Sequence, residues 1–392
     1  MCASNWGGFH EHGEKVTIGE LVKTGTLEFG DGYRTKVSEH GWPGYRIIRV
    51  ADVSENNISF DGPDFVSNDF SRAIGPKSGQ PGDILLTTKG TVGRVAVMPP
   101  IHEPVVYSPQ LCYFRVQDPS KINPRFLRFW FSSPEFWGQA ADRMNNTDMA
   151  AYINMADIRS LKISLPDTAT QQAIAEVLGA LDDKIAANTK LAASSENLGS
   201  ALFQRALQSP DSTTMQLRDL ALNVAGKYLA KSDYENGRYF VYGSNSVMGM
   251  HSAYLCTGGF AVLAKIGSYC GNLRWSQRPA WVNNNASGIV PKAGTSPSIL
   301  RHALQSIDMG PHKAGTGQPY IRMESLFSTE LTVPGKFASA RLGPILESLS
   351  EIEAAASEEN QTLAATRDTL LPQLMSGKLR VKDAETLVSA AV

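Results

Sequence analysis

Cysteine and histidine are scarce in this sequence, which limits the chemistry that it can support. Its 392 residues include only four cysteines and seven histidines. The cysteines form no CxxC pair and the histidines show no zinc-ligand spacing, so neither a zinc site nor a disulfide framework is indicated. Free thiols in a reducing compartment are the simpler interpretation, and they predict a cytoplasmic protein. The four cysteines are Cys2, Cys112, Cys256 and Cys270.

Long apolar runs and a large net charge are also missing. No run of about 18 or more apolar residues is present, which argues against a membrane span. The N-terminus, MCASNWGGFHEHGEK, has no basic start followed by an apolar stretch, so no signal peptide is predicted. The formal net charge is -1, which argues against a protein that binds nucleic acid by bulk charge. Only residues 211–335 are basic, with 11 Lys and Arg against 7 Asp and Glu.

The motifs of several enzyme classes are absent as well. An adenine methyltransferase needs an Asn/Asp-Pro-Pro-aromatic loop, and the nearest match, NPRF at 123–126, lacks the second proline. There is no GxxxxGK(S/T) nucleotide loop, and the FGDG stretch at 29–32 follows a poor candidate for a buried strand. Asp83 and Lys89 do not supply the carboxylate pair that a metal-dependent nuclease requires. We therefore expect no catalytic residue, no metal and no cofactor in this chain.

What the sequence does contain is a long amphipathic helix near its middle. From Gln171 to Leu207 the seam positions alternate by four and three residues, which is typical of a heptad repeat. Thr168 and Gln171 have the spacing of a capping box, and Pro210 stops the helix. An ordinary core helix of a large domain is the alternative, but the length and the polar outer faces favour a coiled-coil-like helix. The seam consists of Ile174, Leu178, Leu181, Ile185, Asn188, Ala192, Ser195, Gly199 and Leu202.

A second helix with the same spacing is predicted near the C-terminus. Pro372 must end or kink it, and Gly377 suits a C-terminal cap. Asn188 in the first seam and Glu359 in the second are polar, and such residues can fix the register between paired helices. The second seam consists of Leu342, Ile345, Leu349, Ile352, Ala356, Glu359, Leu363, Thr366 and Leu370.

The segments that precede the two helices resemble each other, which indicates an internal repeat. AYINMADIRSLKISLP, ending at Pro166, matches PYIRMESLFSTELTVP, ending at Pro334, at a constant offset of 168. DILLTTKGTVGR at 83–94 parallels FAVLAKIGSYCGN at 260–272, and RFLRFWFSS at 125–133 parallels SILRHALQS at 298–306. Because the three blocks occur in the same order and a helix follows each set, we infer a duplication.

A duplicated chain of this kind has a simple packing solution. The two helices pair antiparallel, bury each other's apolar stripes and hold similar domains at opposite ends. The predicted fold class is α+β, with two similar mixed α/β domains separated by two long antiparallel coiled-coil-like helices in a pseudo-twofold arrangement. Such helices fix the distance between two binding domains, as a reader of two DNA half-sites requires. The expected segments are domain 1 at 1–166, a helix at 167–210, domain 2 at 211–335, and a helix and tail at 336–392.

Two blocks of the sequence resemble a known family. LPDTATQQAIAEVLGALDDKIAANTKL, starting at Leu165, is similar to the central conserved region of the specificity subunits of Type I restriction–modification systems. TRDTLLPQLMSGKLRV at 366–381 is similar to their distal conserved region. EFGDGYRTK at 28–36 and KGTVGRVAV at 89–97 look like parts of a target-recognition domain. The similarity covers essentially the whole chain, but the second domain is shorter than the first and the segment before Lys15 has no counterpart.

The resemblance implies a definite role. Specificity subunits bind no cofactor and catalyse nothing, and each target-recognition domain reads one half of a split double-stranded DNA sequence. Their paired helices fix the spacer and dock two adenine methyltransferase subunits, which use S-adenosylmethionine. Restriction/translocase subunits can join that core. The alternative is a stand-alone coiled-coil DNA-binding or scaffold protein without methyltransferase partners, and co-purification would distinguish the two.

Loops rich in amides, hydroxyls and basic groups supply the candidate DNA contacts, because such groups can bind base edges or phosphates. Solvated polar turns explain these residues equally well. In the first domain the candidates are Lys36, Thr88, Lys89, Thr91, Arg94, Asn145, Asn146 and Thr147. In the second they are Ser244, Asn245, Lys265, Ser268, Tyr269, Asn272, Arg274, Lys313 and Gln318. The candidates for helix pairing or a partner interface are Leu178, Leu181, Ile185, Asn188, Leu349, Ile352, Leu363 and Leu370.

Overall fold

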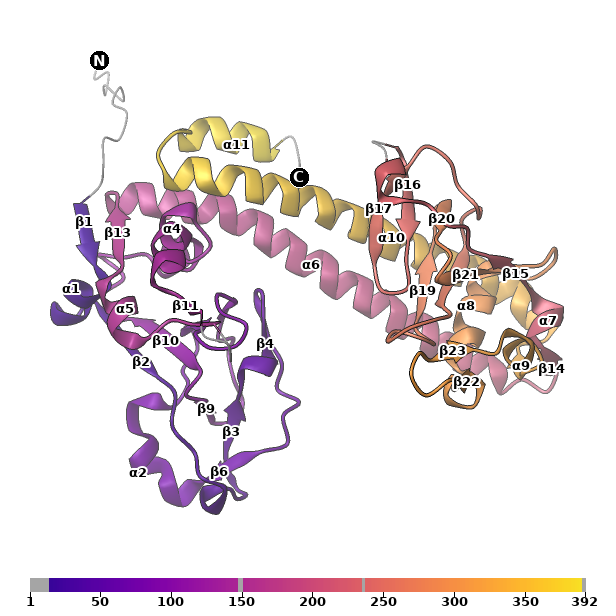
Figure 1. Cartoon of the computed structure of the whole chain (residues 1–392), viewed down its shortest axis with the longest axis horizontal. Coiled ribbons are helices and arrows are strands. Elements are labelled where there is room, and N and C mark those ends of the chain that lie inside the picture. The colour runs from indigo at the N-terminus through magenta and orange to yellow at the C-terminus, as the bar shows by residue number, and fades with distance from the viewer. Residues whose placement is uncertain (1–13, 147–150, 235–236, 390–392) are drawn as a thin grey trace. The chain divides into compact units, whose positions relative to one another are not determined.

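A computed structural model describes residues 14–146, 151–234 and 237–389. The chain divides into two compact units, one formed by Met1–Ile185 with Thr362–Val392 and the other by Ala186–Gln361. Each unit combines one domain of mixed strands and helices with one part of each of two long helices (Figure 1).

A four-stranded antiparallel sheet forms the centre of the first unit, in the order β2-β10-β7-β8. Its inner strands, β7 and β10, are nearly continuous runs of buried residues, as expected for strands covered on both faces. A second sheet, β6-β3-β9, contains one antiparallel and one parallel pair. The strands of the two sheets are β2 (Leu27–Asp31), β3 (Gly44–Ile48), β6 (Phe65–Ser67), β7 (Ile84–Thr87), β8 (Val95–Val97), β9 (Val105–Tyr107) and β10 (Leu111–Val116).

Shorter elements complete the first unit, and its largest core brings Trp130, Phe131 and Phe136 into mutual edge-to-face contact. The two-stranded pairs are β1 (Glu14–Thr17) with β13 (Lys162–Leu165), β4 (Val53–Ser54) with β5 (Asn57–Ile58), and β11 (Asn145–Asn146) with β12 (Ala151–Tyr152). The helices are α1 (Ile18–Lys23), α2 (Ser71–Ile74), α3 (Pro124–Trp130), α4 (Pro134–Arg143) and α5 (Met155–Ser160). The 3-10 turns are η1 (Val37–Glu39), η2 (Val50–Asp52), η3 (Asn68–Phe70) and η4 (Gly75–Lys77).

The second unit repeats this architecture. Its four-stranded sheet has the order β15-β21-β18-β19, and its three-stranded sheet, β17-β16-β20, again contains one parallel pair. Its strands are β14 (Thr213–Gln216), β15 (Ala221–Ala225), β16 (Tyr239–Tyr242), β17 (Val247–His251), β18 (Phe260–Ala264), β19 (Leu273–Ser276), β20 (Ala280–Val282), β21 (Ala286–Pro291), β22 (Lys313–Ala314), β23 (Tyr320–Ile321) and β24 (Glu330–Val333). Its helices and turns are α7 (Leu217–Leu220), α8 (Pro297–Gln305), α9 (Met323–Phe327), η5 (Lys231–Asp233) and η6 (Gly310–His312).

The blocks that match in sequence also match in structure. Residues 83–94 and 260–272 supply the first strand and the loop of the β7–β8 and β18–β19 hairpins, and the two matching helix starts are α3 and α8. Each domain ends in the same strand–helix–strand order, β12-α5-β13 in the first and β23-α9-β24 in the second. The predicted α+β fold class, with two similar domains and two long helices that pack together, is confirmed.

The long helices are α6 (Thr168–Leu207) and α10 (Lys336–Met375). The predicted capping box at the start of α6 is wrong. The Asp167 carboxylate accepts the Thr170 N–H at 2.9 Å, so the cap lies one residue earlier. Gln171 is buried instead and donates its side-chain amide to the Pro166 carbonyl at 2.9 Å.

The C-terminal end of α10 follows the sequence prediction only in part. Pro372 lies inside the last turn rather than beyond it. Gly377 has a φ of 69° and donates its N–H to the Leu374 carbonyl at 3.1 Å, which is the expected cap. A further helix, α11 (Val381–Ser389), lies beside the end of α10 and buries Ala384 in the core of the first unit (Figure 1). None of the helices in the described part of the chain is long and apolar enough to cross a membrane.

In each unit α6 and α10 share a hydrophobic cluster, although two predicted seam positions are wrong, one of them Ile345, which is 51% exposed. The buried candidates are Leu178, Leu181, Asn188, Leu363 and Leu370, while Ile185 and Leu349 are partly buried. Ile352 is 40% exposed, so it does not lie in the seam. Ser350, two residues earlier, is buried because α8 also packs on this stretch of α10 and its Arg301 contacts the Ser350 hydroxyl. A heptad pattern that assumes a single partner helix misses this second contact.

Candidate nucleic-acid interface

Each domain carries a glycine-containing hairpin at the matching place. Gly93, before β8, and Gly271, before β19, have φ values of 96° and 92°, a region that favours glycine. Gly93 donates its N–H to the Thr87 carbonyl at 2.9 Å, and Gly271 donates to Ala264 at 2.8 Å. The two loops therefore close on the last residue of the preceding strand in the same way.

The tip of each hairpin is also held by the strand that follows in the repeat. Lys89 lies opposite Tyr152 in a β-bridge, and Ile266 lies opposite Tyr320. In both domains the glycine that follows the bridge residue adds a backbone hydrogen bond to the same segment. A loop fixed at both its base and its tip loses little conformational freedom when it binds a ligand.

In the first domain the structure separates exposed candidates from those used inside the fold. Lys36, Lys89 and Thr91 are exposed. Thr88 is buried and its hydroxyl donates to the Gln110 carbonyl at 2.9 Å, so it is removed from the candidate contacts. Arg94 is half buried and donates to the Val53 carbonyl at 3.1 Å.

The polar segment 145–147 lies partly beside this hairpin. Asn145 pairs with Tyr152 across β11 and β12, and Tyr152 is also the bridge partner of Lys89. The backbone of Asn145 and Asn146 is thus brought close to the hairpin tip. Thr147 lies outside the described residues.

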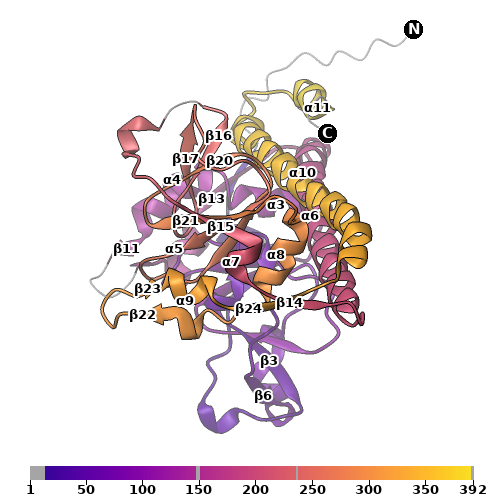
Figure 2. The ribbon, with the colours of Figure 1, turned by 90° about the vertical axis from the view of Figure 1, so that its right-hand side faces the viewer.

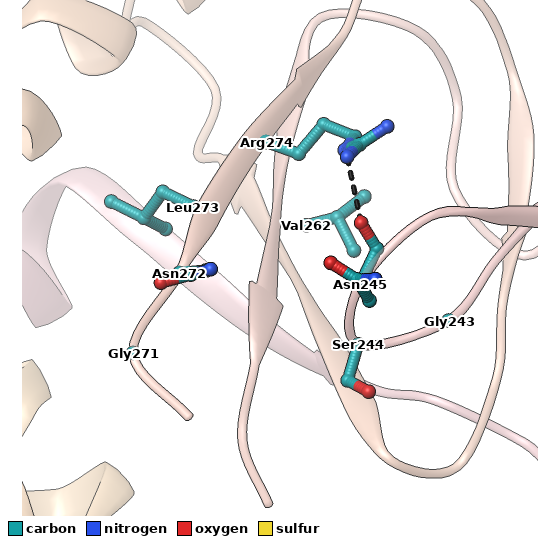
Figure 3. Close-up of a pocket in the computed structure, with 8 residues that line it drawn as sticks. All are labelled: Gly243, Ser244, Asn245, Val262, Gly271, Asn272, Leu273 and Arg274. Atoms are coloured by element: carbon teal, nitrogen blue, oxygen red, sulfur yellow. Dashed lines mark hydrogen bonds between the residues drawn. The ribbon is translucent and has the colours of Figure 1, made fainter. Parts of the chain in front are cut away.

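In the second domain two candidate segments meet at a polar hollow of about 330 Å³ (Figure 3). Arg274 on β19 points across the hollow and donates to the Asn245 carbonyl at 2.7 Å. The lining residues are Gly243, Ser244, Asn245, Val262, Gly271, Asn272, Leu273 and Arg274. Four of the predicted contacts, from two loops whose nearest members are Asn245 and Asn272, therefore share one site.

The remaining candidates of the second domain lie on the hairpin, in β22 or in the loop between β22 and β23. A Cβ atom at Gly271 would lie 2.8 Å from the Lys313 Cε, so the Lys313 side chain passes over the edge of the hollow. Ser268, Tyr269 and Gln318 are exposed, and Lys265 is half buried. The hollow is thus bordered by one arginine and one lysine, which suits an anionic or base-edge ligand.

The two domains differ at the position that Arg274 occupies. In β19, Arg274 lies opposite Val262, and in β8 the residue in the same register is Ala96, opposite Leu85. Ala96 is fully buried in a small core that includes Val53 of β4. At equivalent positions of the two hairpins, the second domain therefore has an arginine that lines the hollow and the first has a buried alanine.

The two most exposed aromatic residues in the described parts of the domains were not among the predicted DNA contacts. Trp42 and Tyr228 are each 72% exposed. Aromatic rings at a nucleic-acid surface can stack on bases. An aromatic residue flanked by glycine and proline, as in HGWPGY, was the available signal for Trp42.

Comparison with known families identifies the type of domain that carries these hairpins. The sequence matches the Type I restriction modification DNA specificity domain twice, over residues 11–196 and 210–363. The chain belongs to this family. Each match contains one of the two domains, so the chain is a DNA sequence-recognition component of a Type I restriction–modification system. The alternative of a scaffold unrelated to such a system is not favoured.

Solved structures resemble this specificity protein over most of their length. The S subunit of a Type I restriction–modification system from M. genitalium has 16% identity and a TM-score of 0.61, over 93% of this chain and 96% of that chain. This likeness supports the fold. The HsdS subunit from Thermoanaerobacter tengcongensis has 16% identity and a TM-score of 0.36, over 93% and 95% of the two chains. A structure from work on assembly and conformational transition of the type I R-M system has 14% identity and a TM-score of 0.40, over 94% and 99%. No curated protein gave a significant match.

Proposed function

We propose that this chain is the non-catalytic specificity subunit that reads a bipartite double-stranded DNA target. Each domain reads one half-site with its glycine hairpin and neighbouring loops. Two adenine methyltransferase subunits, which carry S-adenosylmethionine, dock on the paired helices, and restriction/translocase subunits join the complex.

The duplicated hairpin is the observation that carries this proposal. Two copies of one rigid loop scaffold, with Ala96 in one and Arg274 in the other, suit the reading of two different base sequences. A protein that contacted only the phosphate backbone of DNA would need positive charge, but it would not need two hairpins with different side chains.

Exposed aliphatic side chains on the helices support a docked partner. In the second unit Leu191 and Leu198 of α6 are 48% and 51% exposed, and Ile345 and Ile352 of α10 are 51% and 40% exposed. In each helix the two residues are seven positions apart, so they lie on one side of it. Apolar side chains spaced in this way offer a surface to a partner helix.

The buried carboxylate and thiol groups that resemble catalytic groups have structural surroundings. The buried Asp83 carboxylate accepts hydrogen bonds from the Arg115 guanidinium at 2.7 and 2.8 Å and from the Tyr107 hydroxyl at 2.7 Å. Burial raises the pKa of the Cys256 thiol to about 11 and also raises the pKa of Cys112 and Cys270. These thiols stay protonated at neutral pH and are poor nucleophiles.

Methylation mapping tests the proposal. The chain is co-expressed with a Type I methyltransferase subunit of the same host, and methylated adenines are located by sequencing. We expect one bipartite motif with a fixed spacer, and replacement of residues 211–335 by those of a relative should change one half-site only. A single uninterrupted motif, or methylation by the isolated chain, would contradict the proposal.

A further inference from the structure

A buried arginine joins the first domain to the long helices. Arg128 on α3 is 6% exposed and forms an ion pair with Asp182 of α6 at 3.3 Å. Asp182 also pairs with Arg367 of α10 at 2.8 Å. On its other side Arg128 donates to the Asn56 side chain in the turn between β4 and β5. The Arg128 guanidinium thus connects a turn of the domain to α6 directly and to α10 through the Asp182–Arg367 pair.

The turn that Arg128 holds is in contact with the candidate DNA-binding hairpin. Asn56 donates its backbone N–H to the Val95 carbonyl at 2.9 Å, and Val95 is the first residue of β8. Arg94, one residue earlier, donates to the Val53 carbonyl in the adjacent strand β4. The β4–β5 turn therefore contacts both Arg128 and the hairpin and links the two.

The second domain also contains a buried arginine that joins it to the long helices. Arg301 on α8 has a side chain that is 12% exposed and forms ion pairs with Glu353 of α10, at 2.6 Å, and Glu196 of α6. It also donates to the Ser350 hydroxyl at 3.1 Å. Figure 2 shows α8 lying against α6 and α10. After β19, Gln277 donates to Glu347 and Glu351 of α10 at 2.6 and 2.9 Å, which ties this hairpin to the same helix.

The two arginines occupy equivalent positions in the repeat. Both α3 and α8 begin with a capping residue and a proline, and in both the arginine is the fifth helical residue. Their carboxylate partners are not equivalent, since Arg128 meets an aspartate of α6 and Arg301 meets glutamates of both long helices. The arginine is therefore the shared element, and each domain finds its own acidic partners.

An ion pair of this kind fixes orientation more than it adds stability. Burying charge costs desolvation free energy that the attraction barely offsets, so an apolar contact of similar volume would contribute as much stability. A planar guanidinium with several fixed donors, however, can donate hydrogen bonds to its carboxylates in only a few geometries. A hydrophobic contact between a domain and a helix would allow sliding and rotation that these bonds prevent.

We propose that Arg128 and Arg301 are positioning residues that set the angle at which each domain presents its hairpin from the long helices, and so set the spacer length that the protein accepts. This inference rests on the proposed bipartite DNA reading. In this proposal neither arginine contacts DNA. Arg128 acts through the β4–β5 turn that it holds, and Arg301 acts through α8, which packs against the hairpin strand β18.

The test uses Arg128→Lys and Arg301→Lys in the complete complex with a methyltransferase subunit. Lysine keeps the charge but loses the planar fork. Preferred sites are selected from a DNA library with random spacer lengths. We expect unchanged half-site bases, while the preference for the native spacer over spacers one base pair longer or shorter falls by about tenfold, the effect of one moderate charge-assisted hydrogen bond. Arg125→Lys is the matched control, because Arg125 lies on α3 and pairs with Asp183 of α6 but is 54% exposed.

A second variant separates positioning from folding. Arg128→Met with Asp182→Asn removes both charges of the pair, while residue 182 keeps an oxygen acceptor for Arg367, which also pairs with Asp368. It should melt near the wild-type temperature and still show the weakened spacer preference. Folded variants with the wild-type spacer preference, or variants with altered half-site bases, would overturn the positioning role. If the wild-type protein itself selects no bipartite site, the proposed function fails instead.

Discussion

Asn188 of α6 donates a side-chain hydrogen bond to Glu359 of α10 at 2.6 Å. These are the two polar seam residues that the sequence analysis expects to fix the register. A polar pair in an apolar seam is satisfied in only one alignment of the helices, because any shift leaves it unpaired. The contact therefore supports a role in fixing the helix register.

Removal of one member of this pair should cost more than removal of both. We expect Asn188→Ala to lower the free energy of unfolding by about 1–3 kcal/mol, because Glu359 loses a buried donor. Asn188→Leu with Glu359→Leu should recover that loss, as apolar replacement of a buried polar pair does. Urea unfolding measures both. Equal loss in the single and double variants would show that the pair is not coupled.

The apolar seam of the first unit should not tolerate charge. Leu181 is fully buried and Ile185 is partly buried in the same cluster. Changing both to Asp should destabilise the unit by at least about 4 kcal/mol, because two carboxylates lose hydration without a partner. The measurements are soluble yield and the amount of methyltransferase complex. Ala180→Asp on the same helix is the control, since Ala180 is exposed and lies outside the proposed docking surface.

The hollow of the second domain should contribute to the salt dependence of DNA binding. Lys265→Ala with Arg274→Ala should weaken binding and reduce the slope of log K against log salt by about 2, if each cation releases one counterion. Arg278→Ala is the matched control, because its guanidinium is held by Glu351 at 3.0 Å and Glu358 at 2.8 Å. An unchanged slope in the double variant would remove both residues from the phosphate contacts.

His302 should make stability fall at mildly acidic pH. Burial lowers its pKa below 6.5, although Glu196 and a hydrogen bond with Gln305 oppose the shift. The unfolded chain therefore binds a proton that the folded chain resists, so the contribution is present above about pH 6.5 and is lost as the pH falls through the folded-state pKa. The melting temperature of His302→Gln should fall less between pH 7.5 and pH 5.5 than that of the wild type. Parallel curves would show that His302 does not contribute.

Helix length should determine the spacer. Four residues inserted after Ala187 would lengthen α6 by about 6 Å at ~1.5 Å per residue and keep its seam in nearly the same direction. Because DNA rises about 3.4 Å per base pair, the preferred spacer should grow by one or two base pairs. Selection from a random-spacer library measures this. Altered half-sites with the original spacer would mean that the helices do not measure distance.

The repeat and the long helices could be predicted because they depend on local periodicity and on a duplicated order of blocks. The same reasoning failed at Ile352, where a second helix packs on α10, and at Thr168, where Asp167 competes for the cap. Local sequence patterns do not reveal contacts that are made by segments distant in the chain.

The arginine positions illustrate the same limit for the site. Arg128 and Arg301 align in the sequence blocks RFLR and SILR, but nothing there says that they are buried. Their partners Asp182 and Glu196 look like ordinary solvated residues on the outer faces of α6. The meeting of Asn245 with Arg274 likewise depends on how two loops fold together. Burial of a charged pair becomes visible only when the whole domain is placed on its helix.

The first unit has a consequence for synthesis on the ribosome. Its core contains Leu178 and Leu181 but also Leu363, Leu370 and Ala384, near the other end of the chain. Residues 186–361 must be translated in between, which takes roughly 10–35 s at about 5–20 residues per second. During that delay the apolar stripe at the start of α6 has emerged without its partner helix. The domain that leaves the ribosome first is thus completed last, and the nascent chain depends on chaperones or on rapid folding of the second unit to stay soluble until then.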